Sequence, residues 1–68
     1  SQIVALVQSC KAQLIEVICL GSENEEIMVR NQAQQLFTYL TSLIFENAIP
    51  MREELELMMV KVVFKPAL

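Results

Sequence analysis

The chain has 68 residues, a hydrophobic fraction of 54% and a net charge of −3. This length allows one domain with a marginal core, because a chain this short buries only about 60% of its unfolded surface. Its few scattered cations disfavour nucleic-acid binding, which needs clustered Lys and Arg. The hydrophobic fraction exceeds the ~45–50% of ordinary globular domains. The excess predicts that apolar surface is buried against something outside the chain.

The sequence lacks residue types that common catalytic and metal-binding sites require. The sequence has no His, no Trp and a single Gly. Zinc sites of Cys and His, Ser-His-Asp or Cys-His nucleophiles and Gly-rich phosphate-binding loops therefore cannot be assembled from it. We expect no enzyme activity, no metal and no cofactor.

The first predicted helix covers Gln2 to Leu20 and ends at Gly21, a residue that readily takes the left-handed conformation that closes helices. Apolar residues recur at helical spacing but continue around most of its circumference, which predicts burial on more than one side. Cys10 and Cys19 point to opposite sides of this helix and cannot bridge each other. Free thiols predict a reducing, intracellular compartment, either cytoplasm or nucleus.

The connection after the first helix has the pattern of a capping box. Ser22 is followed three residues later by Glu25, so the Ser hydroxyl would accept from the Glu25 amide and the carboxylate would accept from the Ser22 amide. This pattern predicts that the second helix begins at Glu23. Because the connection is short, the first two helices should form an antiparallel hairpin.

The second predicted helix runs from Glu23 to Asn47 and carries a single apolar stripe opposite a side of Asn, Gln, Thr and Ser. The stripe has the width that one small domain can bury, so this helix is predicted to be the internal spine. The residues Ala48-Ile49-Pro50 should end it, because the residue before a Pro avoids helical backbone angles.

The third predicted helix begins at Pro50 and runs to about Phe64. One of its two apolar stripes includes Met58 and is spaced for the core. The other consists of Leu57, Val60 and Phe64 and lies on the far side. Two stripes on one short helix cannot both face the interior of a three-helix domain, so the outer stripe should meet a partner.

Together these patterns predict an all-α fold. It is a small antiparallel three-helix unit with helices at about 2–20, 23–47 and 50–64, packed in an oligomer. We expect one domain over 1–68 that is a fragment of a longer protein. The predicted core positions are Leu6, Cys10, Leu14, Val17, Val29, Ala33, Leu36, Phe37, Leu40, Leu43, Ile44, Leu55, Met58 and Val62. The predicted partner interface consists of Leu57, Val60, Phe64, Val4, Ile15 and Cys19.

The function that the sequence favours is a non-enzymatic protein–protein interaction module, which forms a homodimer or larger oligomer through apolar faces of the first and third helices. Two alternatives stay open. One is a slice of a HEAT- or armadillo-like solenoid, whose helices are apolar on two sides because they stack on neighbouring repeats. The other is a monomeric hub that binds an amphipathic partner helix in a Met-lined groove. No membrane partner is expected, since no uninterrupted apolar run approaches the ~20 residues of a membrane span.

Overall fold

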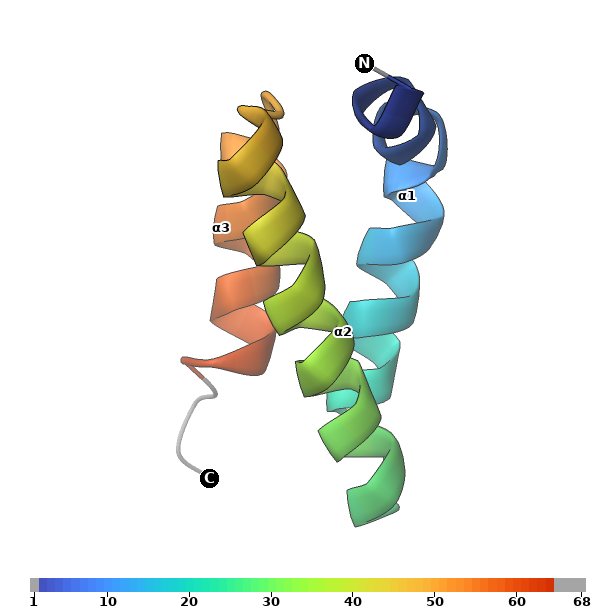
Figure 1. Cartoon of the computed structure of the whole chain (residues 1–68). Coiled ribbons are helices and arrows are strands. Elements are labelled where there is room, and N and C mark those ends of the chain that lie inside the picture. The colour runs from blue at the N-terminus through green and yellow to red at the C-terminus, as the bar shows by residue number, and fades with distance from the viewer. Residues whose placement is uncertain (1, 65–68) are drawn as a thin grey trace.

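The computed structural model describes residues 2–64, which form three helices. They are α1 (Gln2–Ser22), α2 (Ile27–Asn47) and α3 (Arg52–Val62). The chain runs along α1, returns along α2 and reverses again into α3, so successive helices are antiparallel (Figure 1). The all-α three-helix unit predicted from the sequence is confirmed. The ends of the predicted 1–68 domain, Ser1 and 65–68, lie outside the described residues.

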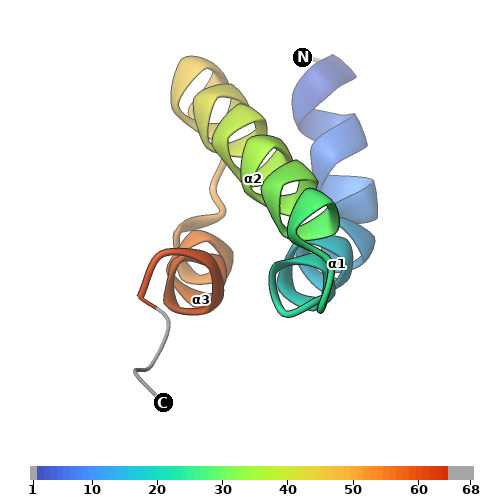
Figure 2. The ribbon, with the colours of Figure 1, turned by 90° about the horizontal axis from the view of Figure 1, so that it is seen from below.

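The helices pack as a triangle, with α2 lying across α1 and α3 (Figure 2). The most extensive contact is between α1 and α2, followed by that between α1 and α3, and the contact between α2 and α3 is the smallest. The helix that touches both others most is therefore α1, whereas the sequence pattern assigned the role of spine to the second helix.

Fully buried side chains at the centre come from three different parts of the chain. Ile18 lies on α1, Met51 lies in the connection between α2 and α3, and Met58 lies on α3, each with essentially no exposed surface. The wider core holds Val7, Ile18, Phe37, Leu40, Ile44, Ile49, Met51, Met58 and Val62. One continuous core therefore joins all three helices and the second connection.

The predicted capping box does not form. α1 continues through Ser22, whose hydroxyl donates to the Cys19 carbonyl at 2.8 Å within the last turn of the helix. Its side chain is buried and already hydrogen-bonded, so it cannot cap the following helix together with Glu25. α2 begins at Ile27, four residues later than the pattern predicted, and no side chain caps its N-terminus.

A turn built on Asn24 replaces the capping box. The Asn24 side-chain oxygen accepts from the Glu26 amide at 2.9 Å. The Arg30 guanidinium donates from the first turn of α2 to the carbonyls of Asn24 and Glu25, both at 2.9 Å. These bonds connect the turn to α2 through side chains other than the predicted Ser–Glu pair.

Gly21 serves helix packing rather than helix termination. It lies inside α1, and no glycine among residues 2–64 has a positive φ. A Cβ atom added to Gly21 would lie 2.9 Å from the Cβ of Ala33 on α2. Gly21 therefore allows a close contact between the backbone of α1 and Ala33 of α2, and the predicted left-handed role of Gly21 is wrong.

Ala48 is the residue that takes the left-handed conformation. It ends α2 with φ 52° and ψ 45°, and its amide donates to the Ile44 carbonyl. The Ile49 amide donates to the same carbonyl at 3.0 Å, an arrangement typical of helix C-termini. Ile49 and Met51 then turn into the core, and α3 begins at Arg52 rather than at Pro50.

α1 bends at Cys10, whose φ of −116° and ψ of 15° are not helical. The side chains of Ser9 and Cys10 both donate to the Leu6 carbonyl, at 2.8 Å and 3.1 Å. Side-chain donors that compete for a helical carbonyl disturb the backbone ladder and bend the helix. The N-terminal part of α1 consequently leaves the axis of the rest of the helix (Figure 2).

Candidate interaction surfaces

The structure divides the predicted core positions into three groups. The buried ones are Ala33, Phe37, Leu40, Ile44, Met58 and Val62. The half-buried ones are Cys10, Leu14, Val29, Leu36, Leu43 and Leu55. The exposed ones are Leu6 (61%) and Val17 (57%), and for these two the prediction is wrong.

The error on α1 has a simple geometric origin. Val7 and Ile18, which directly follow Leu6 and Val17 in the chain, are the residues that enter the core. Neighbouring residues on a helix point about 100° apart, and in a helix that is apolar almost all round both choices keep helical spacing. Tertiary packing, and not periodicity, decides which residue of each pair is buried.

The predicted partner residues of α1 are partly covered by their own chain. Val4, Ile15 and Cys19 pack against the core and are half-buried. Lys11 pairs across the helices with Glu54 of α3 at 3.2 Å, which places this side of α1 against α3. These three residues pack against the core of their own chain, and their contact with a second chain stays a prediction.

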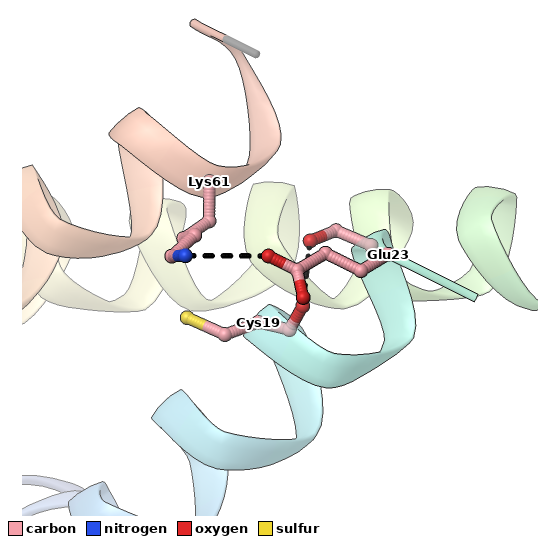
Figure 3. A network of polar contacts seen from close by, with 4 residues as sticks. Cys19, Glu23 and Lys61 are labelled. Carbon is pink, nitrogen blue, oxygen red and sulfur yellow. Dashed lines mark hydrogen bonds and ion pairs between the residues drawn. The ribbon is translucent and has the colours of Figure 1, made fainter. Parts of the chain in front are cut away.

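A second ion pair closes the other end of this contact. Lys61 Nζ of α3 lies 3.3 Å from Glu23 Oε1, just after α1, with the thiol of Cys19 beside them (Figure 3). Burial raises the pKa of the Cys19 thiol, the Lys61 charge lowers it and the Glu23 carboxylate raises it. Because the thiolate is the nucleophilic form of cysteine, the raised pKa lowers the reactivity of Cys19 at neutral pH.

The outer stripe of α3 lies in solvent. Leu57, Val60 and Phe64 are 51%, 54% and 63% exposed. Charged side chains border the stripe, since Glu53 and Glu56 are exposed on the same helix and Glu56 pairs with Arg52 at 3.4 Å. The stripe is thus apolar but interrupted by carboxylates.

An apolar groove of about 230 Å³ lies between α1 and α2, where the bend at Cys10 separates the two helices. Its lining contains no residue of α3 and no charged residue among those described. The lining residues are Ile3, Leu6, Val7, Cys10, Leu14, Leu36, Tyr39, Leu40 and Leu43. Sequence reasoning missed this groove, because the bend that opens it depends on side-chain hydrogen bonds to one carbonyl.

A larger groove of about 610 Å³ lies between the end of α2 and the start of α3. Its lining is mainly apolar but includes Arg52 and Glu56. Met51 and Met59 both line it, although Met51 has essentially no exposed surface, whereas Met58 is fully buried in the core. Two of the three methionines expected in a Met-lined groove for a helix-binding hub therefore lie in this lining.

Metal binding and membrane insertion are two further properties that the described residues bear on. Among residues 2–64 no group of His, Cys, Asp or Glu is clustered so as to hold a metal ion. α1, with a mean hydropathy of 1.7, is long and apolar enough to cross a membrane by length and composition. The sequence interpretation overlooked this because Lys11, Glu16 and several Gln interrupt the apolar run. Core helices of soluble proteins and signal sequences near an N-terminus pass the same test, so this property alone assigns no location.

No protein-family description, no curated protein and no solved structure matches the chain. The function is therefore argued from the surfaces described above.

Proposed function

We propose that the chain is a non-enzymatic protein–protein association module whose partner is a second copy of itself. The observation that carries this proposal is the apolar surface left in solvent on all three helices. Among residues 2–64, eleven large hydrophobic side chains are more than half exposed: Leu6, Val17, Leu20, Ile27, Met28, Tyr39, Phe45, Leu57, Val60, Val63 and Phe64. Scattered single residues of this kind are normal on a surface, but connected groups mark interaction sites.

The energetics favour association over an isolated monomer. A small domain gains little stability from its own core, and oligomerisation is one of the ways in which such chains are stabilised. Burying the exposed half of one large apolar side chain contributes about 1 kcal/mol. Since association costs ~4–15 kcal/mol in lost freedom, a dimer has to cover a connected group of these side chains on each copy.

Thermal unfolding at several protein concentrations tests self-association. When folding is coupled to dimerisation, the midpoint Tm rises with protein concentration by mass action. We expect circular dichroism to show this rise between low micromolar and submillimolar concentrations. A Tm that stays constant over this range would contradict the proposal.

A solenoid slice is the second candidate, and one observation favours it. Exposed apolar residues lie on two separate surfaces, beside the groove between α1 and α2 and on the outer stripe of α3. Stacked repeats cover both such surfaces, whereas a twofold dimer through one face covers only one. A slice removed from its neighbours would bind the dye ANS strongly and lose near-ultraviolet circular dichroism, while a dimerising module would unfold cooperatively.

A further inference from the structure

We infer that a second copy packs on the face formed by α1 and α2 on the side away from α3, so that two α1–α2 hairpins form a four-helix bundle with α3 outside it. This α1–α2 face consists of the stripe Leu6, Cys10, Gln13, Val17 and Leu20, in which Cys10 is half-buried and the others are exposed, the groove beside it, and Met28 and Tyr39 of α2. The inference rests on the self-association proposed above and names the surface that carries it.

The stripe of α1 has the spacing of a helix that packs lengthwise against another helix. Its five positions follow one another at steps of 4, 3, 4 and 3 residues. The apolar ones at its ends, Leu6 and Leu20, are 61% and 62% exposed, and Val17 is 57% exposed. Exposed apolar side chains therefore lie outside the monomer's core on both parts of α1, with Leu6 before the bend at Cys10 and Val17 and Leu20 after it.

α2 adds apolar surface beside this stripe. Met28 and Tyr39 lie eleven residues apart, or about three helical turns, on one side of α2, and are 70% and 63% exposed. Tyr39 also lines the groove between the helices together with Leu6. A ring exposed at the edge of an apolar groove is the kind of side chain on which interfaces depend most.

Charge distribution favours a second copy as the occupant of this face. Residues 31–45 of α2 include no charged side chain, and Lys11 of α1 is engaged with Glu54 on the side of α3. Each copy carries a net charge of −3, and a twofold interface brings equivalent surfaces of both copies together. Exposed Glu16 borders the stripe of α1, but the uncharged run of α2 leaves this face with less like-charge repulsion than the α3 stripe, which Glu53 and Glu56 border.

The dimensions of the molecule agree with this use of the face. The principal extents are 40 × 19 × 18 Å, so the flat outline of one long side measures roughly 760 Å², of the same order as the ~800 Å² that each partner buries in a standard interface. A dimer of standard size would therefore use most of a long side.

Two matched substitutions distinguish the α1–α2 face from the outer stripe of α3. Val17 and Val60 are 57% and 54% exposed and each lies inside a helix. We expect V17E to weaken dimerisation at least about 100-fold in sedimentation equilibrium, because it buries an unpaired carboxylate on both copies. We expect V60E to change the dimerisation constant less than about threefold. Circular dichroism checks that both variants remain helical.

The outcomes separate the inference from the proposed function. Dimerisation that V60E abolishes and V17E spares would overturn the α1–α2 face while leaving self-association intact. A wild-type chain that stays monomeric would overturn both. A monomeric chain that instead floats with phosphatidylcholine vesicles would assign the apolar face to lipid and equally overturn the inference.

The two native cysteines provide an independent readout without substitution. Cys10 lines the groove of the α1–α2 face, and Cys19 lies in the contact between α1 and α3. We expect alkylation of Cys10 by N-ethylmaleimide to slow at least about tenfold as the chain dimerises, whereas the rate at Cys19 stays constant. An unchanged Cys10 rate over concentrations at which the mass doubles would overturn the inference.

Discussion

The close approach of α1 and α2 at Gly21 allows a sharp test of the hairpin. The substitution Gly21→Ala adds one methyl group, whose carbon would lie 2.9 Å from the Cβ of Ala33. Both carbons are attached directly to helical backbones, so neither can rotate away. The two helices have to separate by about half an ångström or more to restore an ordinary carbon–carbon contact.

Two opposing contributions set the size of the effect. Replacing Gly by Ala inside a helix stabilises it by about 1 kcal/mol, whereas forcing a methyl group into a packed contact costs ~1–3 kcal/mol. Because the contact joins two backbones, we take a cost of about 2 kcal/mol, the middle of that range. Gly21→Ala should therefore lower the free energy of unfolding by about 1 kcal/mol.

The sign should reverse when the neighbouring methyl group is removed. In the Ala33→Gly background the nearest remaining atom is the Cα of residue 33 at 3.9 Å, an ordinary contact distance. There Gly21→Ala should stabilise the chain by about 1 kcal/mol, which gives a coupling of about 2 kcal/mol in a double-mutant cycle. Urea denaturation at one fixed protein concentration measures it. Stabilisation by Gly21→Ala in the wild-type background would refute the close approach.

Three further predictions concern the end of α2, the core and the cysteine contact. Ala48→Gly should stabilise the chain by about 1 kcal/mol, because Gly takes the left-handed conformation of residue 48 without strain. The control Ala12→Gly, at an exposed position inside α1, should destabilise the chain by about 1 kcal/mol. Thermal denaturation compares the two variants. Met58→Ala should cost about 2–5 kcal/mol because the side chain is fully buried, whereas Leu57→Ala on the exposed side of α3 should cost less than about 1 kcal/mol in urea denaturation. Glu23→Gln should lower the pKa of Cys19 and Lys61→Met should raise it further, since the carboxylate disfavours the thiolate and the ammonium favours it. The pH dependence of iodoacetamide alkylation at Cys19 measures the direction of each pKa shift. Shifts of the two variants in the same direction would contradict the arrangement in Figure 3.

The part of the fold that the sequence predicted well depends on patterns longer than one helical turn. The existence, order and antiparallel arrangement of three helices follow from long runs at helical spacing and from the breaks near Gly21 and Pro50. The inward side of α2 was predictable at Phe37 and Leu40 because its other side is polar. On α1 the same reasoning chose Leu6 instead of Val7, since an apolar surface all round carries no direction.

The helix ends were harder to predict because several local structures compete for the same residues. Ser22 has the sequence of an N-cap, yet its hydroxyl is satisfied within α1 and the side chain is buried. Gly21 resembles a helix terminator, yet the packing of Ala33 against it makes it a contact residue. The left-handed position fell on Ala48, a residue type with no preference for that conformation. Tertiary packing overrode local preference at each of these positions.

Surplus exposed apolar surface was predictable from the composition, but its position on the helices was not. The apolar excess of the composition indicated surplus surface, and the structure leaves Leu57 and Val60 of α3 exposed as well as Val17 of α1. Which side of α1 faces α3 depends on contacts such as that between Lys11 and Glu54, which are far apart in the chain and form only in the folded unit. The residues Ile15 and Cys19 were assigned to a partner for that reason.

Sedimentation equilibrium of the wild-type chain tests self-association most directly, because it reports mass without a label or a substitution. The chain has a mass of 7.7 kDa. We expect the average mass to rise toward twice that value as the concentration increases from low micromolar to submillimolar, and V17E to keep it at the monomer value. A single monomeric species of the wild-type chain over the whole range, well folded by circular dichroism, would contradict self-association as the function of this apolar surface.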